Sequence, residues 1–413
     1  MILPTQDRAV LVCPYDLGPL SADRDASVVC GQGHRFAVHA GIADLVLAEA
    51  TSAYLHHVPG DTTTYEDSLR PGRGGRRPGR LALALDVVRA ARFYRTTVQR
   101  AWRLFPRDLA TQPLPGADGF RRIHGDTMFT HEVTKRLEKE LFWDDVELPA
   151  PACELGIHSG ESSRYFFGDR ALQWGSNYVP STMQRPREDY PHRGLFAANI
   201  KFLPFVDGSL ASLCCSQTLT VAYASIGSIL AEVNRVLALG GRFAFVTHGP
   251  AFRWALPRDG WPEMGLSALA CQRRIAERSS YMAHLYTMDE WGQLLQAHGF
   301  DVEFSRGLLS SDHARFVQLF YAQEMILPPV FTARYHTPRM RLVKALAGLT
   351  PAREAVAVSR LNTMMGAIVA HELDRHRGAP FDDTRFFDAG IVAVKRRESG
   401  VHRLVPRPRA APS

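Results

Sequence analysis

The chain has 413 residues, of which 46% are hydrophobic and 22% charged, so it can bury a core and has the length of two or three domains. No apolar run approaches the roughly 20 residues that cross a membrane, and the N-terminus lacks the pattern of a secretory signal. The six cysteines show no disulfide-framework spacing, which favours a reducing compartment. We therefore expect a cytoplasmic protein without a membrane span.

Residues 1–50 are expected to form a small β-rich module, because short apolar runs from Leu11 to Leu47 alternate with Gly and Pro turns. Residues 51–129 follow as a basic linker with helices. Much of the excess positive charge lies between Arg70 and Arg80, in a Gly- and Pro-rich run that cannot bury itself and indicates a solvated linker. Nucleic-acid binding is the alternative. No aromatic residues interleave with these arginines to stack bases, so we do not expect a nucleic-acid partner.

From Ala152 onward strands alternate with helices, which indicates a parallel sheet covered by helices on both faces. The expected strands are Ala152–Gly156, Ala171–Gly175, Leu210–Ser216, Arg242–Thr247, Asp301–Ser305 and Gly390–Lys395. The expected helices are Leu81–Phe105, Thr130–Phe142, Ser162–Phe167, Ser228–Leu237 and Met288–Ala297, and Gly240-Gly241 is expected to break the chain before a strand. The pattern predicts a core (130–309), a helical insertion (310–376) that forms a lid or an interface, a final core strand (377–399) and a disordered tail (400–413).

Four segments of this region carry a resemblance to a known family. They are Cys153–Ser163 (CELGIHSGESS), Leu203–Leu210 (LPFVDGSL), Ile229–Phe243 (ILAEVNRVLALGGRF) and Tyr286–Phe300, which contains YTMDEW and AHGF. In this order and at these spacings they resemble the class I S-adenosylmethionine (SAM) methyltransferases of the methyltransferase-11 type. The combination is far more specific than a lone Gly-rich loop.

The resemblance implies an α/β fold: a doubly wound, seven-stranded, Rossmann-like sheet with a helical insertion, preceded by the small N-terminal β-rich module. It also implies SAM as the cofactor and a small-molecule substrate in bacterial-type specialised or surface-glycan metabolism. By their positions in the family's motifs, the cofactor-binding residues would be Glu154, Gly156, Gly160, Asn177 and Asn199. A Gly-rich turn between strand and helix would let the cofactor approach the backbone closely.

The sequence departs from the family's pattern at several of these positions. His158 replaces the middle Gly of the loop, Asn177 and Asn199 replace two acids, and Thr220-Val221 replaces a frequent Glu-His pair. Asn still hydrogen-bonds a hydroxyl or an amine, but losing two charge-assisted bonds would weaken cofactor binding by on the order of a few kcal/mol. Three hypotheses stay open: SAM-dependent methyl transfer, a SAM-independent enzyme that closes a ring or displaces a leaving group, and a non-catalytic partner protein.

His158, Glu161 and His248 are the candidate catalytic residues. All three are expected at the carboxyl ends of strands, where ligands lie in open α/β sheets, and a general base there would assist an oxygen nucleophile. Glu161 could orient the His158 ring. In the SAM-independent hypothesis His158 would act on the substrate as a base or an anion binder. A structural role is the alternative for each residue.

The N-terminal module contains a candidate metal site. Its pattern, Cys13-Pro-Tyr-Asp16 followed by Cys30-Gly-Gln-Gly-His34, resembles zinc-ribbon-like modules that precede or accompany some methyltransferases, with Asp16 where a second Cys is expected. Zinc accepts a carboxylate, so Cys13, Asp16, Cys30 and His34 could close a tetrahedral site. The alternative is that the metal was lost and a small β-module remains. Because such modules accompany some methyltransferases, this resemblance also supports the hypothesis of a protein partner.

Overall fold

The computed structural model describes residues 11–23, 27–47, 88, 98–105, 129–157, 160–168, 170, 172–178, 180, 183, 190–220, 226–252, 284–314, 317, 338–376 and 386–400. The basic run at 70–80, most of the predicted helix at 81–105 and the tail from 401 lie outside these residues, as does His158.

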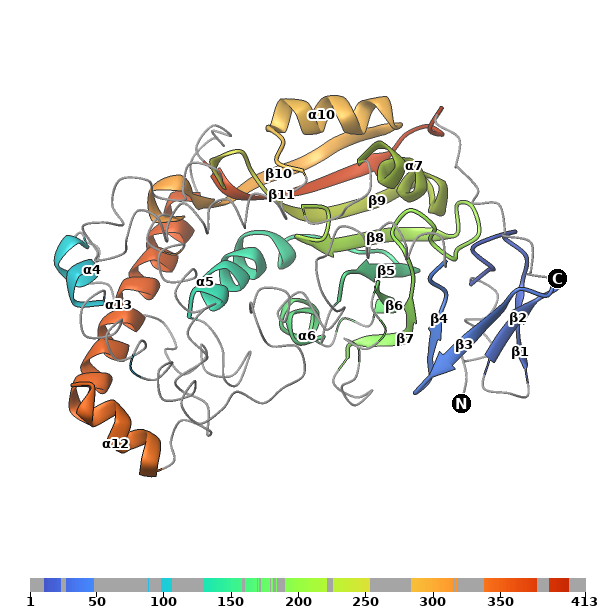
Figure 1. The fold of residues 1–413 in the computed structure, drawn as a ribbon. Coiled ribbons are helices and arrows are strands. Elements are labelled where there is room, and N and C mark those ends of the chain that lie inside the picture. The colour runs from blue at the N-terminus through green and yellow to red at the C-terminus, as the bar shows by residue number, and fades with distance from the viewer. Residues whose placement is uncertain are drawn as a thin grey trace.

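A single mixed sheet organises the described part of the chain (Figure 1). Its order is β1-β2-β3-β4-β7-β6-β5-β8-β9-β11-β10. The strands are β1 (Leu20–Asp23), β2 (Ser27–Cys30), β3 (Arg35–His39), β4 (Ile42–Asp44), β5 (Ala152–Leu155), β6 (Leu172–Asn177), β7 (His192–Ala197), β8 (Leu210–Ser216), β9 (Leu237–His248), β10 (Phe300–Ser310) and β11 (Phe386–Lys395). The expected number of seven strands was wrong: the sheet has 11 strands, because β1 to β4 of the N-terminal module join it.

The seven strands from β5 to β11 form the doubly wound part of the sheet. The strands β7, β6, β5, β8 and β9 are mutually parallel, whereas β11 runs antiparallel between β9 and β10. The chain moves outward in one direction through β6 and β7 and in the other through β8 and β9, so the strand order reverses at β5. In open α/β sheets the crevice at such a reversal, outside the carboxyl ends of the strands, is where ligands bind.

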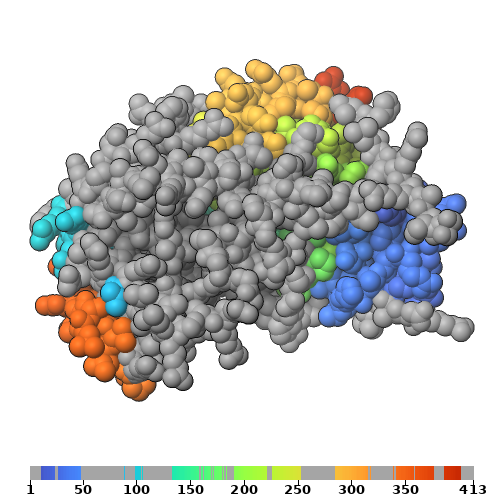
Figure 2. Space-filling model, viewed as in Figure 1, coloured from blue at the N-terminus to red at the C-terminus, as the bar shows by residue number. Residues whose placement is uncertain are grey.

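The N-terminal strands extend this sheet. β4 pairs in parallel with β7 through Ala43↔Phe196 and Asp44↔Ala197, and Leu11 forms an antiparallel bridge with Phe205. The module covers the edge of β7, which would otherwise present unpaired backbone groups. Figure 2 shows it in blue, at the end of the molecule opposite the orange residues of α12 (Pro338–Leu346) and α13 (Pro351–His376).

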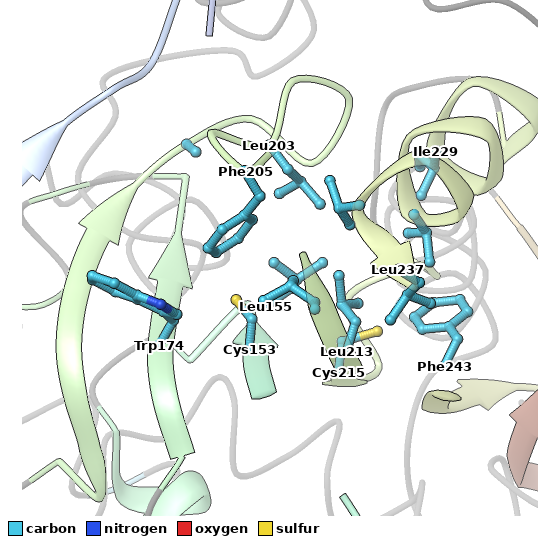
Figure 3. Packing of buried hydrophobic residues seen from close by; sticks show 14 of the residues in the cluster. Cys153, Leu155, Trp174, Leu203, Phe205, Leu213, Cys215, Ile229, Leu237 and Phe243 are labelled. Carbon is cyan, nitrogen blue, oxygen red and sulfur yellow. The ribbon is translucent and has the colours of Figure 1, made fainter. Parts of the chain in front are cut away.

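Helices cover both faces of the sheet. α7 (Ile226–Val236) and α10 (Met288–Ala297) pack on one face, and Leu155 and Phe243 belong to the apolar cluster on that face (Figure 3). Trp174, in the same cluster, packs against Phe205. The opposite face packs against α4 (Gln99–Leu104), α5 (Phe129–Glu138), the π-helix η3 (Lys139–Trp143), α6 (Glu161–Phe167) and α13. Successive strand residues alternate between these two layers.

Most predicted elements from Thr130 onward are confirmed, with shifted ends. α10 has the predicted bounds, and its start is fixed by a capping box in which Thr287 and Glu290 exchange hydrogen bonds. β7 was not predicted. The expected break at Gly240-Gly241 was wrong, because β9 begins at Leu237 and runs through Gly240, which has φ +80°. Among the described residues no helix has both the length and the apolar character needed to cross a membrane.

Candidate functional site

The structure brings the four predicted metal ligands together. One ligand atom from each of Cys13, Asp16, Cys30 and His34 lies within 4.8 Å of every other. His34 Nδ1 is 3.0 Å from Asp16 Oδ2, 3.3 Å from Cys30 Sγ and 3.5 Å from Cys13 Sγ. Ligands at 2.0–2.3 Å from a tetrahedral zinc ion are themselves about 3.3–3.8 Å apart, so the donor set and its spacing fit zinc.

Burial and hydrogen bonds set the protonation of this group. Burial raises the pKa of the Cys13 thiol to about 12. Burial also acts to raise the pKa of Asp16, but hydrogen bonds from the Cys30 thiol and the Gly18 amide outweigh it and leave that pKa below its usual value. Burial therefore favours the protonated thiol of Cys13, whereas the hydrogen bonds to Asp16 favour its ionised carboxylate.

The described residues of the predicted cofactor loop are Gly156 and Ile157 after β5 and Gly160 before α6, and the Gly160 amide donates to the Ile157 carbonyl at 2.8 Å. Gly156 has φ +74° and Gly160 has φ +80°, a region that favours glycine. A Cβ at Gly156 would lie 2.1 Å from Thr218 Oγ1, and a Cβ at Gly160 would lie 2.3 Å from the Tyr190 ring. Both glycines are thus required by contacts within the chain itself.

Glu154 is also engaged by the chain. It is buried, and its Oε2 lies 2.9 Å from His192 Nε2 at the start of β7. Gly175 makes this possible, because a Cβ there would come within 2.7 Å of the His192 ring. Sequence reasoning missed His192, since the strand that carries it was not predicted.

The two asparagines lie at the ends of neighbouring strands. Asn177 ends β6, next to β5, and Asn199 follows β7. Asn199 Oδ1 accepts a hydrogen bond from the Lys201 amide at 2.9 Å. The described carboxyl edge therefore carries Gly156, Asn177 and Asn199 on three neighbouring strand ends.

His248 is the predicted catalytic residue that the structure describes in full. It ends β9 with an exposed fraction of 8%, and its Nδ1 is hydrogen-bonded to Asp388 Oδ1 on β11. The rings of Phe252 and Phe387 flank it at centroid distances of 4.8 and 5.3 Å. In the neutral ring this bond places the proton on Nδ1 and leaves Nε2 as an acceptor. Sequence reasoning missed Asp388, because 140 residues separate it from His248.

The other two predicted catalytic residues are less fully described. Glu161 begins α6, directly after Gly160. His158 lies outside the described residues, so its contact with Glu161 stays a prediction.

A buried polar network lies at the carboxyl end of β8. Lys135 Nζ donates to Glu138 Oε1 at 2.9 Å and to Ser216 Oγ at 2.7 Å, while Ser216 Oγ donates to Glu138 Oε2 at 2.6 Å. Gln217 Nε2 lies 3.3 Å from Glu138 Oε1. The spacing of Lys135 and Glu138, three residues apart on α5, was the only signal available in the sequence.

A second carboxylate–imidazole pair lies at the end of β10. Glu372, on α13, is fully buried and hydrogen-bonds both Ser310 Oγ and His313 Nδ1. β10 is separated from β9 by β11 alone, so polar groups follow the carboxyl edge from β5 to β10.

Comparisons with known proteins found similar solved structures only. No model of a protein family matches the chain, and no curated protein matches it. A complex of the Haloferax volcanii Trm112 methyltransferase activator with a methyltransferase is similar at 16% identity and TM-score 0.33, over 68% of this chain and 94% of that chain. Haemonchus contortus phosphoethanolamine N-methyltransferase 2 with SAM is similar at 14% identity and TM-score 0.36, over 68% of this chain and 57% of that chain. Streptomyces coelicolor geranyl diphosphate C-methyltransferase is similar at 13% identity and TM-score 0.34, over 70% of this chain and 86% of that chain. Likeness at this level establishes neither fold nor activity, so the fold rests on the strand order above.

Proposed function

We propose that the chain is a SAM-dependent methyltransferase that acts on a small molecule with an ionisable O–H or N–H group. The observation that supports this is the shared carboxyl edge: the Gly156–Gly160 turn at the strand-order reversal lies along the same edge as an imidazole oriented by a carboxylate. A placement in specialised or surface-glycan metabolism is part of the proposal and rests on the sequence resemblance alone.

The residues fit the cofactor in part. The backbone of Gly156 and Gly160 would face it, and the side chains of Asn177 and Asn199 would hydrogen-bond its ribose and adenine. Glu154 would contribute less to this role, because its Oε2 is hydrogen-bonded to His192 within the chain. When bound, SAM supplies a methyl group on a sulfonium sulfur.

His248 would remove the acceptor's proton. Asp388 accepts the Nδ1–H, so the Nε2 lone pair is free to take a proton from a hydroxyl or amine and the Asp388 carboxylate stabilises the resulting imidazolium. Phe252 and Phe387 pack against the ring and limit its contact with water. Positioning of the acceptor in line with the methyl group would be the other main contribution to the rate.

A SAM-independent enzyme is the second candidate function, and specific contacts favour it. Thr218 and Tyr190 lie in the space beside Gly156 and Gly160, and His192 is hydrogen-bonded to the Glu154 carboxylate. Three of the five family positions, Glu154, Gly156 and Gly160, thus have contacts within the chain. In this case the same His248–Asp388 pair would remove a proton during ring closure or displacement of a leaving group.

Titration calorimetry with SAM and S-adenosylhomocysteine separates the two candidates. Binding of both ligands supports methyl transfer, and Asn177→Ala and Asn199→Ala should each weaken it. No detectable binding at millimolar ligand would reject the methyltransferase and leave the SAM-independent enzyme.

We also propose that Cys13, Asp16, Cys30 and His34 hold one structural zinc ion. The support is the donor set and the 3.0–3.5 Å spacing of its atoms around His34 Nδ1. Elemental analysis of protein purified without chelator should find about one zinc per chain, and Cys13→Ser with Cys30→Ser should abolish it. A stoichiometry near zero in the unaltered protein would reject the site.

A further inference from the structure

The network around Lys135 has the composition of a site that recognises an ammonium group. The Lys135 ammonium is held by the Glu138 carboxylate and the Ser216 hydroxyl, and its Nζ lies 5.1 Å from the centroid of the Phe166 ring. A carboxylate, a hydroxyl and an aromatic face together are how proteins bind organic cations. We call these groups, with Gln217, the ammonium cage.

Stability alone does not account for this cage. Lys135 has an exposed fraction of 5% and Glu138 of 0%, among apolar neighbours such as Val133 and Leu137. A buried ion pair is weak evidence for stability, since well-packed apolar residues often serve as well or better. Gln217 adds strain: it adopts φ +56° without being glycine.

The cage lies beside the predicted cofactor turn. Ser216 is the last residue of β8, the strand next to β5 at the order reversal. Two residues on, Thr218 packs against Gly156 and donates to the Leu155 carbonyl at 3.2 Å. The aromatic wall, Phe166, belongs to α6, the helix that Gly160 begins. The cage is therefore within one strand of the turn and on the face covered by α5 and α6.

From this geometry we propose that the cage is a binding site for a ligand's ammonium group and that Lys135 fills it from within the chain. The inference rests on the proposed function, because the ligand class is an adenosyl amino acid whose α-ammonium would replace the Lys135 Nζ. With the cage filled by Lys135, the protein gains little from a ligand's amine. Once Lys135 is removed, the carboxylate of Glu138 and the hydroxyl of Ser216 are left to receive that amine.

The test compares two ligands that differ only in the amine: S-adenosylhomocysteine and its desamino analogue, S-(5′-deoxyadenosyl)-4-thiobutyrate. Calorimetry on the full chain should give similar dissociation constants for both with the unaltered protein. Lys135→Met keeps the length of the side chain but removes the charge, and should favour S-adenosylhomocysteine over the analogue by roughly tenfold or more, the effect of one charged hydrogen bond. Lys139→Met is the matched control, because Lys139 is the next lysine along and pairs with Asp144 near the surface. It should leave the ratio unchanged.

The outcomes are distinguishable. If both ligands bind but Lys135→Met leaves their ratio unchanged, the cage is structural and only this inference is overturned. If neither the unaltered protein nor Lys135→Met binds either ligand, the proposed function fails together with the inference. Should Lys135→Met not fold, Lys135→Ala is refolded in ethylammonium chloride and in sodium chloride at equal ionic strength. Recovery that requires ethylammonium supports the cage, because the free amine then replaces the missing one, and equal recovery overturns it.

Discussion

At the scale of single residues, the His248–Asp388 pair leads to the first prediction. Replacing His248 by Gln removes the proposed base, so kcat should fall by roughly 10²–10⁴-fold, the usual contribution of a general base, while the dissociation constant for SAM stays unchanged. Asp388→Asn should also lower kcat, because the ring loses the carboxylate that fixes its tautomer. The measurement is S-adenosylhomocysteine release with an acceptor found by screening. His298→Gln is the control, since this buried imidazole bonds the Leu294 carbonyl on α10. Full activity in both site variants would remove the pair from the mechanism.

Glu154 gives the second prediction, because its Oε2 bonds buried His192 and we expect its carboxylate to serve the structure rather than a ligand. Glu154→Ala removes the hydrogen bond to buried His192 and should lower the free energy of unfolding by about 1–3 kcal/mol, as measured by urea denaturation. Its affinity for S-adenosylhomocysteine should stay the same. A loss of affinity with unchanged stability would return Glu154 to the cofactor site.

The candidate site was partly predictable at this scale. The resemblance to known motifs identified the four candidate metal ligands and the two glycines, because each motif is a short run of the sequence. Asp388, His192 and Ser216 could not be identified, because their partners lie 140, 38 and 78 residues away and only the sheet order brings them together. The sequence also could not reveal that Thr218 and Tyr190 fill the space beside the glycines.

At the scale of elements, α10 gives the third prediction. Thr287 and Glu290 form a complete capping box at its start, and Thr287→Ala should lower the free energy of unfolding by about 1 kcal/mol. Urea denaturation measures this change, and zinc content and ligand affinity should not alter, because α10 packs on the face away from α5 and α6. A stability change below about 0.3 kcal/mol for Thr287→Ala would show that the box contributes nothing.

Elements differed in how well the sequence defined them. α10 was predicted to the residue because a cap, an apolar stripe and a terminal Gly299 all mark it. β7, with the sequence HRGLFA, lacks alternation and contains Gly194, so nothing local marked it. Gly194 is needed for packing instead: a Cβ there would lie 2.3 Å from the Trp174 ring.

At the scale of the whole molecule, the N-terminal module is continuous with the sheet that carries the candidate site. β4 is the neighbour of β7, and Ile42 of β4 packs in one apolar cluster with Ile157, Met183 and Tyr190. Ile157 belongs to the glycine turn, and Tyr190 lies against Gly160. His34, one of the candidate metal ligands, directly precedes β3, which pairs with β4. A short path of contacts therefore joins the proposed zinc site to the turn.

The last prediction follows from this path. Removing zinc should loosen the β3–β4 hairpin, because His34 directly precedes β3. Ile42 of β4 packs against Ile157, so the Ile42 cluster and then the glycine turn should loosen as well. Hydrogen exchange measures this loosening. On chelation of zinc, protection should fall at the amides of Gly156 and Ile157, which both donate to the Ser176 carbonyl, and at the amide of Gly160. Amides within α10 serve as the internal reference and should keep theirs. Ile42→Ala should reproduce part of this loss of protection with zinc still bound, because it removes apolar contacts from the cluster and does not change a candidate metal ligand. Unchanged protection of Gly156 and Ile157 in zinc-free, folded protein would show that the module covers the edge of the sheet without influencing the site.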